Sequence, residues 1–199
     1  MYPSFQVLGP YDFACLQKAG PWIGDQALEQ KHALQKKFIA VIGYPQSGKS
    51  TIIQALSGCK NHSYKDHITD DSVGLSIYVH ASSLQENPQT AESDFKIVLQ
   101  DVKKRLNSQG LVIAIQPNAP NKRLLMETMF DLARQAGFES YAFILEYPFD
   151  GERLKPTLLN KIKSRVQESD SDARVFTLDG RRFAVLNAEA IRSLSRFPL

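Results

Sequence analysis

The chain has 199 residues, a formal net charge of +3, and 43% hydrophobic and 23% charged residues. This composition is typical of one globular domain that buries an apolar core. Two cysteines, Cys15 and Cys59, exclude a disulfide framework and a four-thiolate zinc site, and the mild positive charge does not by itself indicate a nucleic-acid-binding protein.

The N-terminal part of the chain reads as an extension. Residues 1–24 are rich in aromatic residues, glycine and proline, and Asp25 could cap a weakly patterned helix that runs to about Lys36. We expect residues 1–36 to pack on the core that follows. The start of the chain lacks the pattern of a secretory signal, and no apolar run reaches the length of about 18 residues that a membrane span needs. A cytoplasmic protein without a membrane span is therefore expected.

From residue 37 onward, strand and helix patterns alternate. Continuous apolar runs at 37–43, 111–115 and 141–145 predict strands that are buried on both faces. Helical periodicity predicts helices over 50–56, 93–108, 121–136 and 158–166. This alternation indicates an α/β domain over residues 37–199, a three-layer sandwich with a mainly parallel central sheet.

Three details complete the expected fold. Gly110 is predicted to end the helix over 93–108. Asp179-Gly180 predicts a hairpin turn between strands at 174–178 and 182–186. Asn187 is predicted to cap a last helix.

A glycine-rich loop follows the first apolar strand. The pattern G-x-x-x-x-G-K-[ST] is matched in full between a buried strand and a helix, by Gly43, Tyr44, Pro45, Gln46, Ser47, Gly48, Lys49, Ser50 and Thr51. Backbone N–H groups of such a loop and of the helix start bind phosphates. Lys49 is expected to contact the β- and γ-phosphates, and the Ser50 hydroxyl to bind Mg²⁺. The sequence therefore predicts a P-loop domain that binds ATP, or GTP, with Mg²⁺.

An acidic pair follows about twenty residues after Lys49. In P-loop proteins a second element supplies a carboxylate near Mg²⁺ or near the attacking hydroxyl group. Asp70 is therefore a candidate magnesium ligand, and Asp70 or Asp71 a candidate catalytic base. The alternative is a solvated acidic turn that caps a following helix.

These motifs together resemble the P-loop kinases of the polynucleotide-kinase and zeta-toxin kind, over roughly residues 37–165. In that family an acidic pair ends a strand after the phosphate loop, where this chain has Thr69-Asp70-Asp71. Its later G-x-x-V-I-I-D-x-T-N strand and loop are similar to residues 110–118, and a basic lid helix would follow from Glu152-Arg153. The resemblance implies that Lys49 and one of the aspartates transfer the γ-phosphoryl group of ATP to a hydroxyl of a nucleic-acid end, a metabolite or a protein.

Two other functions remain open. Gln116 stands where the kinases carry an aspartate, and Pro117 follows in place of a hydroxyl residue, which favours a catalytically weak or silent nucleotide-binding or interaction module. Residues 71–74 spell the D-x-x-G of a GTPase, but the guanine-reading N-K-x-D is missing at 118–121. The gap from Lys49 to Asp71 also leaves little chain for a switch segment and an added strand.

Overall fold

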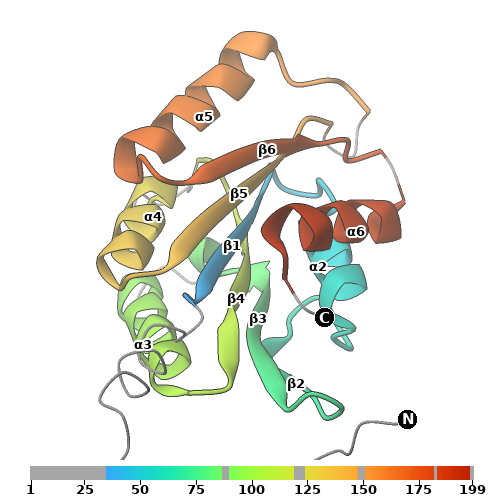
Figure 1. Cartoon of the computed structure of the whole chain (residues 1–199). Helices are drawn as coiled ribbons and strands as arrows, with labels where there is room; N and C mark the ends of the chain where they lie inside the picture. Colours follow the sequence, from blue (N-terminus) through green and yellow to red (C-terminus); the bar gives the residue numbers. More distant parts are fainter. Residues whose placement is uncertain (1–34, 87–89, 119–123, 148–150, 182, 198–199) are drawn as a thin grey trace, which may run out of the picture. The chain divides into compact units, whose positions relative to one another are not determined.

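The computed structural model describes residues 35–86, 90–118, 124–147, 151–181 and 183–197. The chain divides into residues 1–34 and residues 35–199, and all described residues belong to the second unit. The expected N-terminal extension and almost all of its helix lie outside the described residues, as do the first residues of the helix expected from Asn121. Within the described part, strands and helices alternate along the chain (Figure 1).

Six strands of the described part form one sheet in the order β2-β3-β4-β1-β5-β6. Their bounds are β1 (Lys37–Ile42), β2 (Lys65–Asp70), β3 (Leu75–Ser83), β4 (Ser108–Ile115), β5 (Glu139–Leu145) and β6 (Arg174–Leu178). β2 pairs with β3 in the antiparallel direction, and every other pair is parallel. The prediction that the three apolar runs share one parallel sheet, with the first run in its centre, is confirmed.

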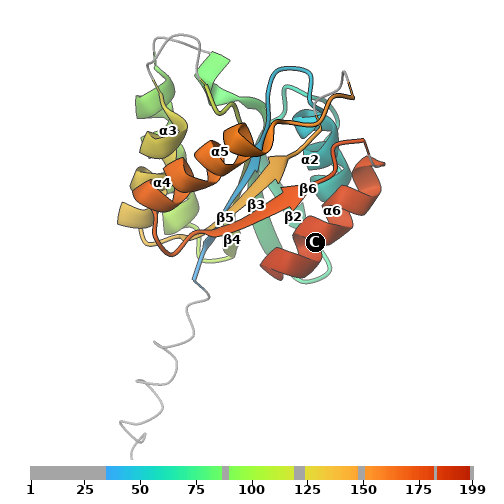
Figure 2. The same ribbon diagram turned by 90° about the horizontal axis from the view of Figure 1, so that it is seen from above.

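Helices cover both faces of this sheet. The α-helices of the described part are α2 (Lys49–Ser57), α3 (Ala91–Lys104), α4 (Met126–Gln135), α5 (Pro156–Ser169) and α6 (Ala184–Ser195), and a short 3-10 helix spans Leu84–Glu86. In two perpendicular views α3, α4 and α5 lie on one face, and α2 and α6 lie on the other (Figures 1 and 2). None of the described helices is long and apolar enough to cross a membrane. The expected α/β layering is therefore present.

β1 supplies the centre of both apolar cores. Because successive strand residues point to opposite faces, Phe38, Ala40 and Ile42 join the cluster under α3, α4 and α5. Ile39 and Val41 join the cluster under α2 and α6. All five side chains are completely buried, which explains why this segment reads as one continuous apolar run.

Two consecutive lysines at the start of β1 hold one helix on each face of the sheet. The Lys36 Nζ donates to the carbonyl oxygens of Val102 and Arg105 at the end of α3, the first at 2.6 Å. The Lys37 Nζ donates to the carbonyl oxygens of Ser195 and Arg196 at the end of α6, at 2.6 and 2.8 Å. Cations are favourable at helix C-termini, where unpaired carbonyls gather. Because consecutive side chains point to opposite faces of the sheet, one lysine reaches each helix layer.

The C-terminal segment does not form the expected hairpin. After β6 the chain turns at Asp179 and enters α6 at Ala184, so the strand predicted over 182–186 is wrong. Ala188 and Ile191 lie three positions apart and are both completely buried against the sheet, which gives this segment a helical apolar face. Asn187 lies inside the first turn of α6, where its Nδ2 donates to the carbonyl oxygen of Asp179 at 2.9 Å.

Two further expectations are corrected at the amino-terminal edge of the sheet. Gly110 does not end a helix, because α3 ends at Lys104 and Gly110 lies inside β4, paired with Lys37. The gap after Lys49 does hold an added strand, β2. β2 is mostly polar and lies partly exposed at the edge of the sheet, so it lacks the apolar pattern of a buried strand.

Gly110 offers a test of how closely β4 approaches β1. A Cβ atom built at Gly110 would lie 2.0 Å from the Lys37 carbonyl oxygen, and its φ is +146°. We expect Gly110→Ala to lower the free energy of unfolding by about 3 kcal/mol, because both the backbone and its neighbour must shift. Gly137→Ala is the matched control: its φ is +85° but its Cβ would meet open space, so about 1 kcal/mol is expected. Urea unfolding measures both, and equal losses would contradict the close contact.

Candidate functional site

The glycine-rich loop lies at the carboxyl-terminal edge of the parallel strands, directly after β1. Its first residue, Gly43, donates its N–H to the Ile115 carbonyl oxygen at the end of β4, 3.0 Å away. The neighbours of β1 are β4 on one side and β5 on the other. The chain after β1 enters α2 on one face of the sheet, whereas the chain after β4 and after β5 leads to α4 and α5 on the other face (Figures 1 and 2). Open parallel sheets bind ligands at such carboxyl-terminal crevices.

The backbone of the loop is tightly curled. Gln46 and Gly48 have positive φ values of 61° and 84°, and the Ser47 N–H donates to the Tyr44 carbonyl oxygen at 3.3 Å. A Cβ atom at Gly43 would lie 2.3 Å from the Ser47 Oγ. A side chain at Gly43 would therefore displace the Ser47 hydroxyl and press on Leu145, and glycine is favoured at Gly48 by its left-handed conformation.

The lysine of the motif folds back across the loop. The Lys49 side chain is 7% exposed, and its Nζ donates to the Tyr44 carbonyl oxygen at 2.7 Å. The Ile52 N–H is bonded to the Gly48 carbonyl oxygen, which begins the helical pattern of α2. The N–H groups of the turn before it have no intrahelical acceptor, and no side chain caps this helix. The cation and these N–H groups together make the loop electropositive.

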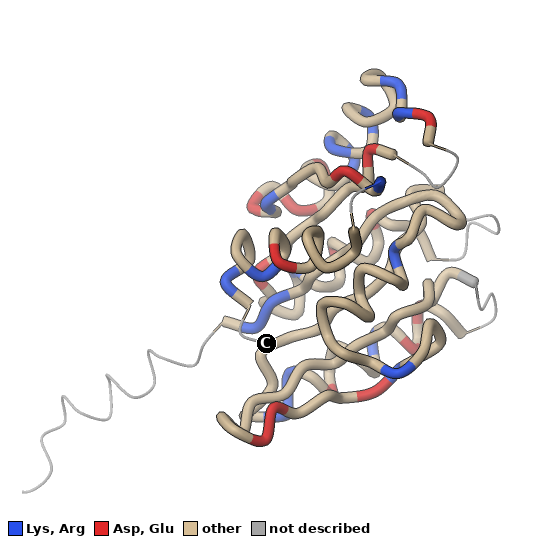
Figure 3. The backbone as a smooth tube through the Cα atoms, turned by 90° about the vertical axis from the view of Figure 1, so that its right-hand side faces the viewer, with Lys and Arg blue, Asp and Glu red and all other residues tan. Residues whose placement is uncertain are grey.

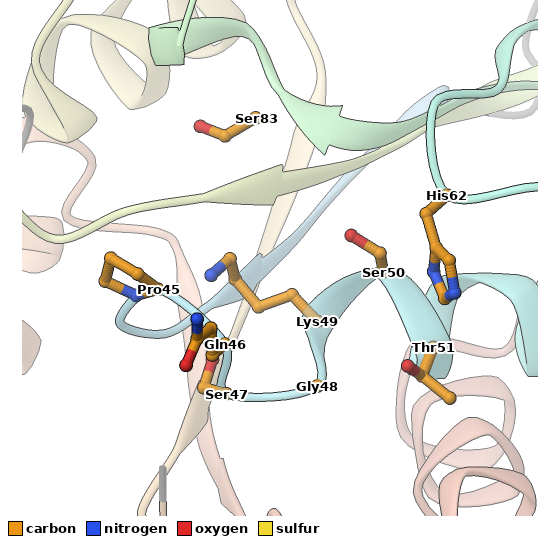
Figure 4. Close-up of a pocket in the computed structure, with 9 residues that line it drawn as sticks. All are labelled: Pro45, Gln46, Ser47, Gly48, Lys49, Ser50, Thr51, His62 and Ser83. Atoms are coloured by element: carbon orange, nitrogen blue, oxygen red, sulfur yellow. The ribbon is translucent and has the colours of Figure 1, made fainter. Parts of the chain in front are cut away.

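A pocket of about 700 Å³ opens over this loop. It is lined by Pro45, Gln46, Ser47, Gly48, Lys49, Ser50, Thr51, His62 and Ser83. Figure 4 shows the Lys49 side chain and the Ser50 hydroxyl extending from the loop toward the side that Ser83 lines. Seven of the nine motif residues predicted to bind nucleotide therefore line one pocket. Gly43 and Tyr44 are not among the residues that line it.

One polar atom in the loop lacks a partner. The Ser47 Oγ is buried and has no hydrogen-bond partner among the described residues. Buried hydroxyl groups in native proteins are nearly always paired. An unpaired buried hydroxyl group in a curled, electropositive loop is consistent with a site for a polar ligand.

The acidic pair lies at the other edge of the sheet. Asp70 ends β2 and pairs with Leu75, which begins β3. β3 runs parallel to β4 and β4 to β1, so Asp70 and Asp71 lie at the amino-terminal edge. The six residues of β1 separate the two edges by ~20 Å. The structure does not bring Asp70 or Asp71 to Lys49 or Ser50, because β2 runs antiparallel and carries the pair away from the loop.

Asp70 instead stabilises the tight turn between β2 and β3. Its carboxylate accepts from the Ser72 N–H at 2.9 Å and from the Ser72 Oγ–H at 2.6 Å. These hydrogen bonds, the hydroxyl one most, hold the pKa of Asp70 below its usual range. The D-x-x-G pattern over 71–74 falls in the same turn. It therefore also lies at the edge opposite the glycine-rich loop. The segment is therefore an exposed acidic turn, as the alternative expected, but the turn leads into β3 and caps no helix.

Gln116 does follow β4 at the edge that carries the glycine-rich loop. It is buried, and its N–H donates to the Gln85 Oε1 at 2.6 Å. The Gln85 Nε2 donates in turn to the carbonyl oxygens of Gln116 and Leu124, at 3.1 and 3.0 Å. This network ties the ends of β3 and β4 to the segment before α4. Gln116 contributes only backbone groups to it, so the Gln85 side chain is the one that makes the connection.

The basic segment expected to form a lid is a packed helix. Several of the basic residues after Glu152 fall on α5, the uppermost helix in Figures 1 and 3. Leu159, Ile162 and Val166 bury its inner side, and the Arg165 Nη2 donates to the Glu127 Oε2 on α4 at 3.0 Å. This helix belongs to the outer layer of the sandwich.

A second pocket, of about 800 Å³, adjoins the pocket over the glycine-rich loop through Ser83, which lines both pockets. Its lining residues are Ser63, Lys65, Tyr78, His80, Ser82, Ser83, Leu84, Asp94, Ile97 and Val98. Sequence reasoning did not assign these side chains to a site. The alternating apolar residues of β3 are typical of a strand. The carboxyl end of β3 lies at the same edge as the loop because β3 runs parallel to β4, and β4 to β1.

The acidic pair gives a direct test of this geometry. The double variant Asp70→Asn, Asp71→Asn is expected to bind ATP with Mg²⁺ as tightly as the wild type, because the strand length separates the pair from the loop. Calorimetric titration measures the affinity. Loss of binding by a variant that still unfolds cooperatively would show that the pair reaches the nucleotide.

Comparisons with known proteins add no assignment. No protein-family model, curated protein or solved structure matches the chain. Any statement about function therefore depends on the residues and their geometry.

Proposed function

We propose that this protein binds a nucleoside triphosphate, ATP or GTP, through residues 43–51. The observation that carries the proposal is the Lys49 ammonium group folded over a curled loop that ends at the N-terminus of α2. Phosphates are bound by this combination of a point charge, convergent N–H groups and a helix start. The pocket over the loop has the volume of a small-molecule site.

Mg²⁺ fits the proposal as a partner of the phosphates. The described residues contain no cluster of three or more His, Cys, Asp or Glu side chains placed to hold a metal ion, and the pocket lining includes no carboxylate among them. Mg²⁺ prefers oxygen ligands, keeps several waters and commonly binds through substrate phosphates. Ser50 is the residue that would add a protein oxygen. Asp70 does not, because it lies at the opposite edge.

The lysine provides the primary test. Lys49→Ala is expected to remove nucleotide binding and keep the fold, because the side chain is a charge directed at the loop. Wild-type protein at a hundredfold excess of ATP over Kd should gain roughly 2.7 kcal/mol in unfolding free energy, and the variant should gain none. Lys60→Ala, at an exposed position, is the matched control and should behave as the wild type. Thermal unfolding with and without ATP and Mg²⁺ measures the gain; equal gains in the wild type and Lys49→Ala would contradict the assignment.

Phosphoryl transfer to a hydroxyl acceptor is the second candidate function, as the resemblance to polynucleotide-kinase-like enzymes implies. The observation that favours it is the second pocket, which adjoins the phosphate loop at Ser83. Its volume suits a metabolite or a nucleotide end. In such a transfer the acceptor oxygen bonds to the γ-phosphorus, the bond from that phosphorus to the β–γ bridging oxygen breaks, and the hydroxyl proton passes to a base.

Two titratable side chains in the second pocket could take that proton. His80 lines the pocket, and an imidazole is the side chain that most often serves as a general base. Asp94 also lines the pocket, and its Oδ2 accepts from the Thr90 hydroxyl at 2.6 Å. These residues replace Asp70 and Asp71 as the candidate bases.

Filling the second pocket separates an enzyme from a silent nucleotide-binding module. Ile97 lines this pocket and is 63% exposed, so Ile97→Trp should occupy it without unfolding the protein. Transfer from γ-labelled ATP to oligonucleotide ends, sugar nucleotides or protein should fall at least about tenfold, with ATP affinity unchanged.

Leu106→Trp, at a fully exposed site outside the pocket, is the control for that experiment and should transfer normally. Wild-type transfer by Ile97→Trp would mean that the acceptor does not use this pocket. No transfer by the wild type to any acceptor would leave the nucleotide-binding module as the function.

A further inference from the structure

The turn after β6 lies against the phosphate loop. A Cβ atom built at Gly180 would lie 2.2 Å from the Tyr147 carbonyl oxygen and 3.7 Å from the Ser47 carbonyl oxygen. Tyr147 follows β5, the strand beside β1. This turn, the end of β5 and the phosphate loop therefore meet on the flank of the loop opposite to the second pocket, which lies on the β3 side.

A planar cation is fixed over an aromatic ring at this meeting point. The Arg181 guanidinium lies 3.7 Å from the centroid of the Tyr147 ring. Asp179 holds its orientation, because its Oδ1 accepts from Nε and its Oδ2 from Nη2, each at 3.2 Å. The Arg181 side chain is nevertheless 55% exposed. One face of the guanidinium thus packs on Tyr147 while the rest of the side chain remains open to solvent.

The pairing with Asp179 weakens the attraction of this cation for a phosphate. A phosphate would need the guanidinium N–H donors on its edge, and Asp179 already occupies two of them. The carboxylate also offsets the positive charge. Three of the five N–H donors remain beyond this pair, and so does the flat face of the guanidinium that does not pack on Tyr147. A face of this kind stacks on aromatic rings.

We propose that the stack of Arg181 on Tyr147 is the platform for the nucleobase of the nucleotide bound at the phosphate loop. This inference rests on the proposed function, since it places the rest of the same ligand. Both Asp179 oxygens are engaged by Arg181, so the platform stacks a base without reading its hydrogen-bonding edge. It therefore accepts adenine and guanine alike.

A lysine substitution isolates the stacking from the charge. Arg181→Lys keeps the positive charge but has no planar group, so we expect its affinity for ATP, and equally for GTP, to fall about tenfold. Its affinity for inorganic tripolyphosphate, which has no base, should be unchanged. Arg105→Lys is the matched control, because Arg105 is 50% exposed and likewise pairs with an aspartate, Asp101, at the end of α3. Calorimetric titration with Mg²⁺ measures each ligand on the full chain.

Each other result overturns the platform. Unchanged ATP and GTP affinity in Arg181→Lys would show that the base lies elsewhere, and an equal loss for tripolyphosphate would show that Arg181 acts on the phosphates. A loss for one purine alone would show that the site reads base edges. Failure of the wild type to bind tripolyphosphate and ATP would instead remove the phosphate-loop proposal, and the platform with it.

Discussion

Burial of β1 on both faces is the constraint on which the site depends. Residues 38–42 are completely enclosed between two helix layers and two parallel neighbours. A register shift of one residue would exchange the side chains of the two cores, so the strand has a single placement. Its end fixes Gly43 against Ile115, and the curl of the loop into α2 begins from that point. The position of Lys49 thus follows from the packing of a strand that contains no functional residue.

The two edges of the sheet carry different kinds of polar group. At the amino-terminal edge, Lys36 and Lys37 form hydrogen bonds with the carboxyl-terminal ends of α3 and α6. Asp70 forms hydrogen bonds within the turn after β2. These three side chains therefore stabilise the fold. At the carboxyl-terminal edge the strands end in loops, where helix starts and side chains can converge on a ligand. Charged residues that look equivalent in the sequence therefore have different tasks according to the edge that they reach.

The proposals assign three neighbouring regions of that carboxyl-terminal edge to one reaction centre. The phosphate loop lies in the middle, the second pocket adjoins it through Ser83, and the stack of Arg181 on Tyr147 lies on its other flank. The amide network of Gln85 and Gln116 braces the ends of β3 and β4 between them. A rigid edge of this kind would hold a triphosphate between its base and an acceptor.

The sequence by itself determined the features that depend on local patterns. Double-sided apolar runs identified β1, β4 and β5 as buried parallel strands, and the glycine and lysine spacing identified the loop, because both signals lie within a few consecutive residues. Only the tertiary structure decided the direction of β2, since a polar edge strand lacks the apolar pattern of a buried one. It also decided that 184–195 is a helix and that Arg181 meets Tyr147. Those outcomes depend on contacts between segments far apart in the chain, which no local pattern encodes.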